Sequence, residues 1–174
     1  MSRRTTAIAA ALSVLALGSP LITACANPLA TNSYDSGIEK YEQGNYQGAI
    51  ADFTKAIEIN PQYADSFSNR GVAKSYLGDY QGAIADHNKS IEINPKNADA
   101  FYNRGNSKNR LGDLQGAIAD YTKAIEINPQ YAAAYFNRGV ARELVNDIEG
   151  ACRDWRKAAD FGLTEPTEWV KKQC

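Results

Sequence analysis

The sequence predicts an all-α fold, a right-handed solenoid of four helix-turn-helix units followed by a short capping helix. Three observations predict it. Small residues recur every 34 residues, two apolar helical stripes lie within each period, and the first three periods end at a helix-breaking proline. Helix pairs this short are not stable alone in water, so stacking must bury a continuous core.

The repeat is clearest in four columns of small residues. Glycine forms two columns, alanine a third, and alanine or serine the fourth. The columns are Gly37, Gly71, Gly105 and Gly139; Gly48, Gly82, Gly116 and Gly150; Ala49, Ala83, Ala117 and Ala151; and Ala56, Ser90, Ala124 and Ala158. Small side chains at these places let the helix backbones approach closely.

A short turn separates the two helices of each unit. In the second unit Leu77 and Gly78 end the first helix, because glycine accepts a left-handed backbone, and Asp79 can cap the next helix. The fourth unit has Asn146, which also tolerates that backbone. Asn-Pro pairs at 60–61, 94–95 and 128–129 close the first three units, since proline cannot continue a helix.

The period, the small-residue columns and the closing proline resemble the tetratricopeptide repeat (TPR) family. The resemblance covers residues 30–165. The units are 30–63, 64–97, 98–131 and 132–165, and residues 166–174 are expected to form the capping helix. In this family the first helices line a concave groove that holds peptides or protein segments. The resemblance therefore implies a non-enzymatic scaffold that binds a protein or an extended peptide.

The resemblance also implies which residues line the groove. The candidate contacts are Tyr34, Asn69, Tyr102, Asn103, Phe136 and Asn137. Asparagine both donates and accepts hydrogen bonds, which suits a peptide backbone, and tyrosine adds apolar area and cation contacts. The alternative is that these asparagines only solvate the groove. One subfamily grips a terminal carboxylate with lysines, but aromatic residues stand in that column here, so no such clamp is predicted.

Residues 1–26 have the pattern of a secretory signal peptide, and 27–29 are expected to form a short linker. Arg3 and Arg4 precede an apolar run at 7–17, which is too short to span a membrane. Residues 22–25 (Ile-Thr-Ala-Cys) resemble the lipobox of bacterial lipoproteins, in which the cysteine is lipidated. We therefore expect an exported protein anchored to a bacterial membrane through Cys25. Cleavage after Ala26 is the alternative and would release a soluble periplasmic or secreted protein.

Export predicts a disulfide between Cys152 and Cys174. The compartment is oxidising, and lipidation of Cys25 leaves these as the remaining thiols. The alternative is two unpaired cysteines, one of them a small apolar core residue.

Two charged columns are expected to hold neighbouring repeats in register. An aspartate column is complete, whereas the matching arginine column is broken by Ser36 in the first unit. Pairing each aspartate with the basic residue of the next unit leaves no aspartate unmatched. The predicted ion pairs are Asp52–Arg70, Asp86–Arg104, Asp120–Arg138 and Asp154–Lys172. The alternative is that the arginines bind an acidic ligand.

The composition argues against an enzyme, a nucleic-acid partner and a metal site. The formal net charge is -1, and the chain has one histidine and three cysteines. No nucleophile elbow, phosphate-binding glycine loop or H-E-x-x-H motif occurs, and no cofactor is predicted. His87 shares a column with Phe53, Tyr121 and Trp155 and is interpreted as a packing residue.

The predicted function is a binding scaffold of the bacterial cell envelope, with a partner whose identity the residues do not specify. The alternative is a structural or self-assembling envelope module, whose groove is filled by its own N-terminus or by a second copy. If two copies exchanged their N-terminal segments in this way, the protein would form dimers.

Overall fold

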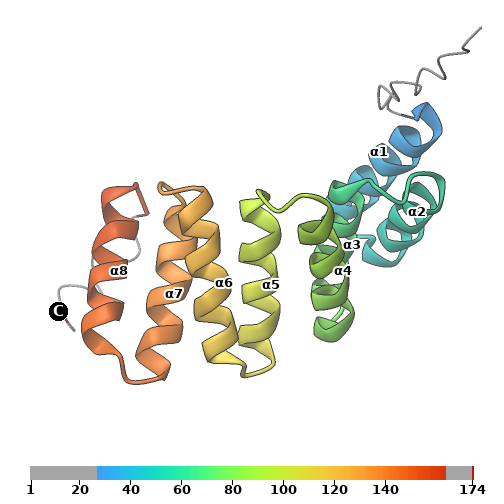
Figure 1. Ribbon diagram of the computed structural model, residues 1–174. Helices are drawn as coiled ribbons and strands as arrows, with labels where there is room; N and C mark the ends of the chain where they lie inside the picture. Colours follow the sequence, from blue (N-terminus) through green and yellow to red (C-terminus); the bar gives the residue numbers. More distant parts are fainter. Residues whose placement is uncertain (1–26, 164–173) are drawn as a thin grey trace, which may run out of the picture.

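The computed structural model describes residues 27–163 and Cys174, and these residues form eight helices (Figure 1). The helices are α1 (Pro28–Glu42), α2 (Tyr46–Ile59), α3 (Ala64–Tyr76), α4 (Tyr80–Ile93), α5 (Ala98–Arg110), α6 (Leu114–Ile127), α7 (Ala132–Leu144) and α8 (Ile148–Asp160). They form four antiparallel pairs, so the predicted all-α solenoid is confirmed. The predicted signal peptide, with Cys25, and the predicted capping helix up to residue 173 lie outside the described residues.

The helix starts follow the repeat, with one difference at the N-terminus. Helices α3, α5 and α7 begin at the first residues of the second, third and fourth predicted units. Helix α1 begins at Pro28, so the predicted linker 27–29 is instead a helix cap and first turn. Asn27 accepts a hydrogen bond from the Leu29 N–H at 3.1 Å, and the ring of Pro28 favours the first helical position.

The turns inside the repeats use the predicted residues. Gly78 has a φ of 83° and Asn146 a φ of 65°, both in the left-handed region. Asp79 then caps α4, because its Oδ1 accepts the backbone N–H of Gly82 at 2.9 Å.

Each helix pair packs a large buried side chain of its second helix against a glycine of its first. The pairs are Phe53 on Gly37, His87 on Gly71, Tyr121 on Gly105 and Trp155 on Gly139. A Cβ atom at Gly139 would lie 2.5 Å from the Trp155 ring, and one at Gly37 would lie 2.6 Å from the Phe53 ring. Any side chain there would push the two helices apart, which explains the glycine column.

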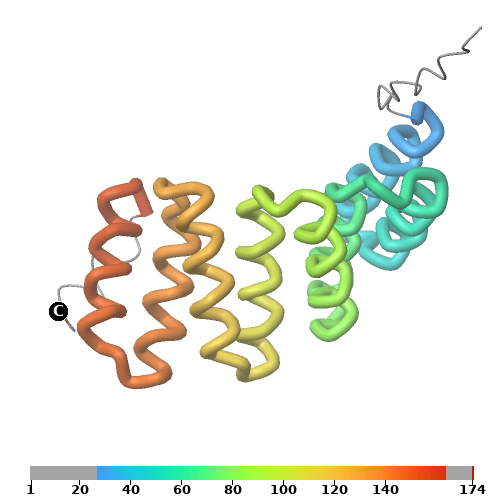
Figure 2. The backbone as a smooth tube through the Cα atoms, viewed as in Figure 1, coloured from blue at the N-terminus to red at the C-terminus, as the bar shows by residue number. Residues whose placement is uncertain are grey.

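The pairs stack in chain order and leave one set of helices along a common face. Helix α2 packs on α3, α4 on α5 and α6 on α7, while α1, α3, α5 and α7 also contact one another in sequence. Figure 2 shows α5 to α8 side by side, with α1 and α2 turned relative to them. Among the described residues, no helix has the length and apolar character needed to cross a bilayer.

Candidate functional site

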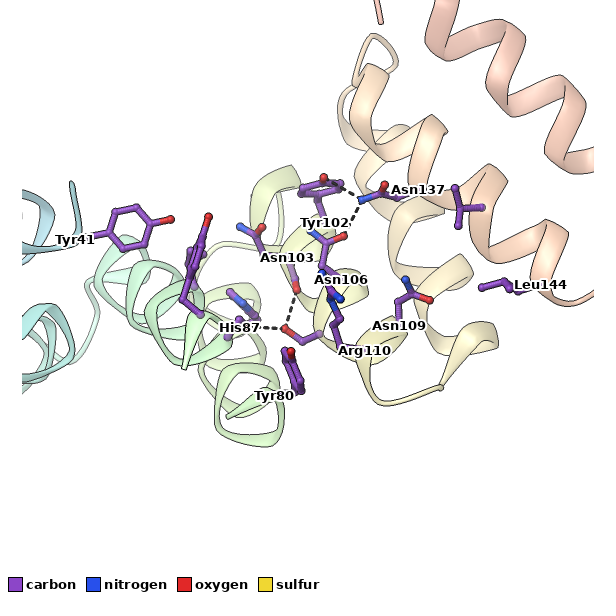
Figure 3. A pocket seen from close by; sticks show the side chains of 15 residues that line it. Tyr41, Tyr80, His87, Tyr102, Asn103, Asn106, Asn109, Arg110, Asn137 and Leu144 are labelled. Carbon is purple, nitrogen blue, oxygen red and sulfur yellow. Dashed lines mark hydrogen bonds between the residues drawn. The ribbon is translucent and has the colours of Figure 1, made fainter. Parts of the chain in front are cut away.

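A groove of about 1050 Å³ runs along the first helices of the repeats (Figure 3). Its lining comes from α1, α3, α5 and α7, with two residues of α4. The lining residues are Tyr41, Val72, Ser75, Tyr76, Tyr80, His87, Tyr102, Asn103, Asn106, Ser107, Asn109, Arg110, Asn137, Val140 and Leu144.

Helix α5 supplies the polar centre of the groove. Asn103, Asn106 and Asn109 recur every third residue, so they share one face of the helix. Ser107 on the same helix lies 3.0 Å from Ser75 of α3, oxygen to oxygen, which joins the two helices across the floor. Arg110 ends this stripe and carries the charge among the lining residues.

Two of the asparagines predicted for the groove join neighbouring repeats. Asn69 donates from its side-chain amide to the Tyr34 hydroxyl at 2.8 Å, and Asn137 donates to the Tyr102 hydroxyl at 3.0 Å. Each of these bonds links a residue to the tyrosine of the preceding repeat. The NH2 groups of Asn69 and Asn137 are therefore engaged within the protein before any ligand arrives.

Asn103 is different because the preceding repeat has Ser68, whereas the repeats that precede Asn69 and Asn137 have Tyr34 and Tyr102 at this position. Ser68 is buried and too short to reach it. In the part of the chain that the structure describes, the Asn103 side chain makes no hydrogen bond, and neither does that of Asn109. Both half-buried amides line the groove with their donors and acceptors unused.

The predicted groove residues therefore divide into two sets. Tyr102, Asn103 and Asn137 line the groove, whereas Tyr34, Asn69 and Phe136 do not lie in the lining drawn from the described residues. Tyr34 instead stacks on Tyr63, with ring centroids 4.9 Å apart, and burial is the largest of the causes that raise its pKa.

Sequence reasoning missed Asn106 and Asn109. Asn106 stands in a column that is otherwise apolar, with Ile38, Val72 and Val140 in the other repeats. It accepts hydrogen bonds from the Tyr121 hydroxyl at 2.8 Å and from Asn137 at 2.9 Å. A polar residue that breaks an apolar column was the signal that could have found it.

His87 lies beneath the groove floor and is fully buried. Burial lowers its pKa to about 4, so the imidazole is neutral at neutral pH. Neither ring nitrogen has a hydrogen-bond partner among the described residues. The predicted packing role agrees with this position, although the polar ring carries an unsatisfied donor and acceptor.

The two ends of the groove differ in chemistry. Toward α1 it is aromatic: Tyr46 and Tyr76 stack with centroids 4.7 Å apart, and Tyr41 meets Tyr76 edge-on at 5.6 Å. Toward α7 it is aliphatic, with Val140 and Leu144. An extended chain in this groove would meet aromatic rings, then free amides, then aliphatic side chains.

The predicted ion pairs between repeats are wrong in their register. Arg70, Arg104 and Arg138 bind aspartates of their own repeats, and a second basic residue twelve positions before each aspartate binds it as well. The observed pairs are Lys40–Asp52, Arg70–Asp86, Lys74–Asp86, Arg104–Asp120, Lys108–Asp120, Arg138–Asp154 and Arg142–Asp154. Lys172, the predicted partner of Asp154, lies outside the described residues.

The first repeat explains why the pattern misled. Asp52 lacks an arginine but accepts hydrogen bonds from Ser36 and Lys40, both at 2.6 Å. Burial raises the Asp52 pKa, but the hydrogen bonds from Lys40 and Ser36, together with the positive charges of Lys40 and Lys55, outweigh burial and hold the pKa below its usual value. The aspartate is therefore paired within its repeat without an arginine.

The arginines do join neighbouring repeats, but through neutral groups. Nη1 of Arg70 donates to the Thr54 hydroxyl of the preceding repeat at 3.1 Å, and Arg104 reaches Asn88 in the same way at 2.7 Å. Each guanidinium therefore binds a carboxylate in its own repeat and a neutral oxygen in the repeat before.

Cys152 and Cys174 are joined in the structure by a disulfide, as the sequence predicts. Their Cα atoms lie 5.7 Å apart, which is ordinary for such a bond. Cys152 is buried in α8, so the bond attaches Cys174 to this helix.

A family profile described as TPR repeat matches residues 37–75, 76–112 and 105–144, more than half of the chain. The chain belongs to the tetratricopeptide repeat family. A comparison with curated proteins gives no match. TPR domains are typically non-catalytic.

Solved structures share the TPR fold. The crystal structure of MamA protein is 21% identical with a TM-score of 0.72, over 83% of this chain and 86% of that chain. The first TPR of Spaghetti (RPAP3), bound to the HSP90 peptide SRMEEVD, is 24% identical with a TM-score of 0.68, over 68% and 94%. The Arabidopsis OM64 TPR domain is 27% identical with a TM-score of 0.64, over 66% and 94%.

Proposed function

We propose that this TPR protein is a non-enzymatic scaffold that binds an extended, weakly charged protein segment in its groove. The observation that carries the proposal is that the side-chain amides of Asn103 and Asn109 on α5 make no hydrogen bond within the described residues. In contrast, Asn69 and Asn137 donate hydrogen bonds to tyrosines of the preceding repeats. Amides spaced along one face of α5 suit the alternating donors and acceptors of an extended backbone.

The low charge of the groove favours a ligand that differs from an acidic peptide. A TPR domain of the same fold binds SRMEEVD, which is rich in carboxylates. Here Arg110 is the charged residue of the lining, and tyrosines and aliphatic residues occupy the two ends. The groove therefore favours a segment with neutral polar residues in the middle and an apolar residue near α7.

A peptide-selection experiment tests this function. Four first helices about 8–10 Å apart span roughly 30 Å, which an extended peptide covers with about nine residues. Peptides of that length would be selected from a random library on the purified chain. Their dissociation constants would then be measured by fluorescence anisotropy.

Two amide substitutions provide the comparison. Asn103→Ala should weaken a selected peptide roughly three- to tenfold, since it removes one or two hydrogen bonds. Gln115→Ala, an exposed amide of α6 outside the groove, should leave affinity unchanged. Equal affinity for both variants, or selection of acidic peptides, would contradict the proposal. A solution mass that rises with concentration would instead favour the self-assembling module.

The cell envelope is the proposed location. Arg3 and Arg4, the apolar run that follows and Cys25 within a lipobox-like segment support export and lipidation. Mass spectrometry of the native N-terminus tests this. A diacylated or triacylated Cys25 is expected, and an unmodified chain starting at Asn27 would contradict lipidation.

A further inference from the structure

A row of exposed apolar side chains follows one edge of the solenoid, at the turns inside the repeats. In Figure 1 the α3–α4, α5–α6 and α7–α8 turns lie along the same lower edge. Leu77 and Leu111 are each 44% exposed, and Leu144 is 62% exposed. We name this surface the turn edge, and its apolar members are Tyr76, Leu77, Leu111, Leu144 and Ile148. Exposed apolar side chains grouped on one edge indicate an interaction site.

The turn itself does not require these leucines. The first repeat makes the same turn, because φ is 75° at Gly44 and 83° at Gly78. At the position of Leu77, however, the first repeat has the exposed Gln43. A polar side chain is therefore compatible with this backbone. The leucines of the second and third repeats expose apolar surface that the fold alone does not explain.

A carboxylate accompanies the apolar residues in each of these three turns. Asp79, Asp113 and Asp147 are exposed, whereas the first repeat has the neutral Asn45. Within the described residues Asp79 and Asp113 form no ion pair, and Asp147 lies 3.5 Å from Arg142. The second, third and fourth repeats thus present apolar and acidic groups together.

The turn edge continues the groove, and Leu77 and Leu111 stand one period of 34 residues apart. Tyr76 and Leu144 belong to both surfaces, since they also line the groove. Helices α3, α5 and α7 are neighbours, and packed helices lie about 8–10 Å apart. A polyproline II segment has three residues per turn and rises about 3.1 Å per residue, so every third side chain advances by roughly one repeat.

We propose that the turn edge docks a second protein segment, in the polyproline II conformation, with an aliphatic side chain at every third position and basic residues between them. The aliphatic side chains pack on Leu77 and Leu111, which share one repeat position, and on Leu144, which stands at the position of Tyr76 in the second repeat. The basic residues pair with the capping aspartates, and a cation also contacts the exposed ring of Tyr76. This surface does not depend on the ligand proposed for the groove.

A fluorescein-labelled peptide of repeated Pro-Leu-Lys triplets is the probe. Its dissociation constant would be compared with those of a Pro-Leu-Glu peptide and of a shuffled peptide with the same composition as the probe. The probe should bind at least roughly tenfold more tightly than either control peptide. Failure of the probe to bind, or equal binding of all three peptides, would overturn the proposal.

A double variant, Leu77→Gln with Leu111→Gln, tests the surface itself. It copies the residue that the first repeat already uses, so circular dichroism should show an unchanged helical fold. Binding of the probe should fall roughly tenfold, whereas Asn103→Ala should leave it unchanged. Unchanged binding by the double variant would overturn the proposal, as would loss of binding in Asn103→Ala.

A lipid surface is the competing occupant of an exposed apolar edge. Co-sedimentation with phosphatidylglycerol vesicles separates the two, because three carboxylates should repel an anionic membrane. We expect the double variant and the parent chain to sediment equally. Sedimentation that depends on Leu77 and Leu111 would assign the turn edge to the membrane and overturn the docking proposal.

Discussion

Arg70 holds Asp86 of its own repeat with two parallel hydrogen bonds, Nε to Oδ2 at 2.9 Å and Nη2 to Oδ1 at 2.7 Å. The remaining nitrogen reaches Thr54 of the repeat before, at 3.1 Å. The Arg70 side chain thus joins the two helices of its own repeat and also joins that repeat to the preceding one. The same arrangement recurs at Arg104 and Arg138, so the register of the solenoid is specified once per junction.

Asp120→Asn should destabilise the solenoid strongly. Asp120 is buried and binds both Arg104 and Lys108, so neutralising it leaves two partly buried cations without their carboxylate. The free energy of unfolding in urea should fall by about 2–4 kcal/mol. The control is Glu126→Gln, which breaks the exposed pair with Lys123 and should cost less than about 0.5 kcal/mol. Similar costs for the two variants would contradict this account.

His87→Phe should stabilise the protein and remove part of its sensitivity to acid. Because the folded pKa is about 4, below the ordinary value near 6.5, the unfolded chain binds a proton first as the pH falls. Stability from this residue is therefore lost between about pH 6.5 and pH 4, amounting to about 2 kcal/mol by about pH 5. Urea unfolding at about pH 7.5 and about pH 5 measures this loss, which the phenylalanine variant should not show. An identical pH dependence in both proteins would exclude His87 as the cause.

Cys174→Ser should lower the stability of the oxidised protein. The disulfide joins residues 22 positions apart, and closing a loop of this size contributes about 3 kcal/mol in the chain-entropy model. Thermal unfolding with and without dithiothreitol tests this. The reduced parent should match the variant, and dithiothreitol should not affect the variant. A parent insensitive to dithiothreitol would mean that the thiols are unpaired.

Asn137→Ala should lower the stability of the protein, whereas Asn103→Ala should lower its affinity for the ligand. Asn137 donates to Tyr102 and Asn106, so its loss should cost about 1–2 kcal/mol of unfolding free energy. Asn103 forms no such bond within the described residues, so alanine there should change stability by less than about 0.5 kcal/mol while weakening ligand binding. A large stability loss in Asn103→Ala would show that its amide is structural.

The fold could be predicted because each turn and each close contact between helices requires a particular residue type at one position. Gly78 and Asp79 define a helix end and a helix start, and Gly71 marks where a neighbouring ring must fit. These are local or single-pair requirements that recur with the period. Sequence reasoning placed the second, third and fourth units at the residues where α3, α5 and α7 begin.

The aspartate and arginine columns alone could not show whether the ion pairs form within a repeat or between neighbouring repeats. An arginine lies 16 residues before the aspartate of its own repeat and 18 after that of the previous one, so spacing alone does not choose. The deciding column was Lys40, Lys74, Lys108 and Arg142, which is complete in all four repeats. It supplies Asp52 with a cation in the first repeat, where Ser36 replaces arginine.

The groove could be predicted only in part, for a geometric reason. The columns do not reveal that a tyrosine hydroxyl reaches the asparagine 35 residues later, because that contact depends on how adjacent repeats stack. With the contact known, Ser68 explains why Asn103 remains free whereas Asn69 does not.

The most direct test of the proposed function is the side-chain amide spectrum of the protein as a selected peptide is added. Nitrogen-15 NMR would follow the NH2 signals of Asn103 and Asn109, with Gln115 of α6 as the reference. The account predicts that the two groove amides shift in proportion to occupancy while Gln115 stays in place. Saturable binding that leaves Asn103 and Asn109 unshifted would contradict it.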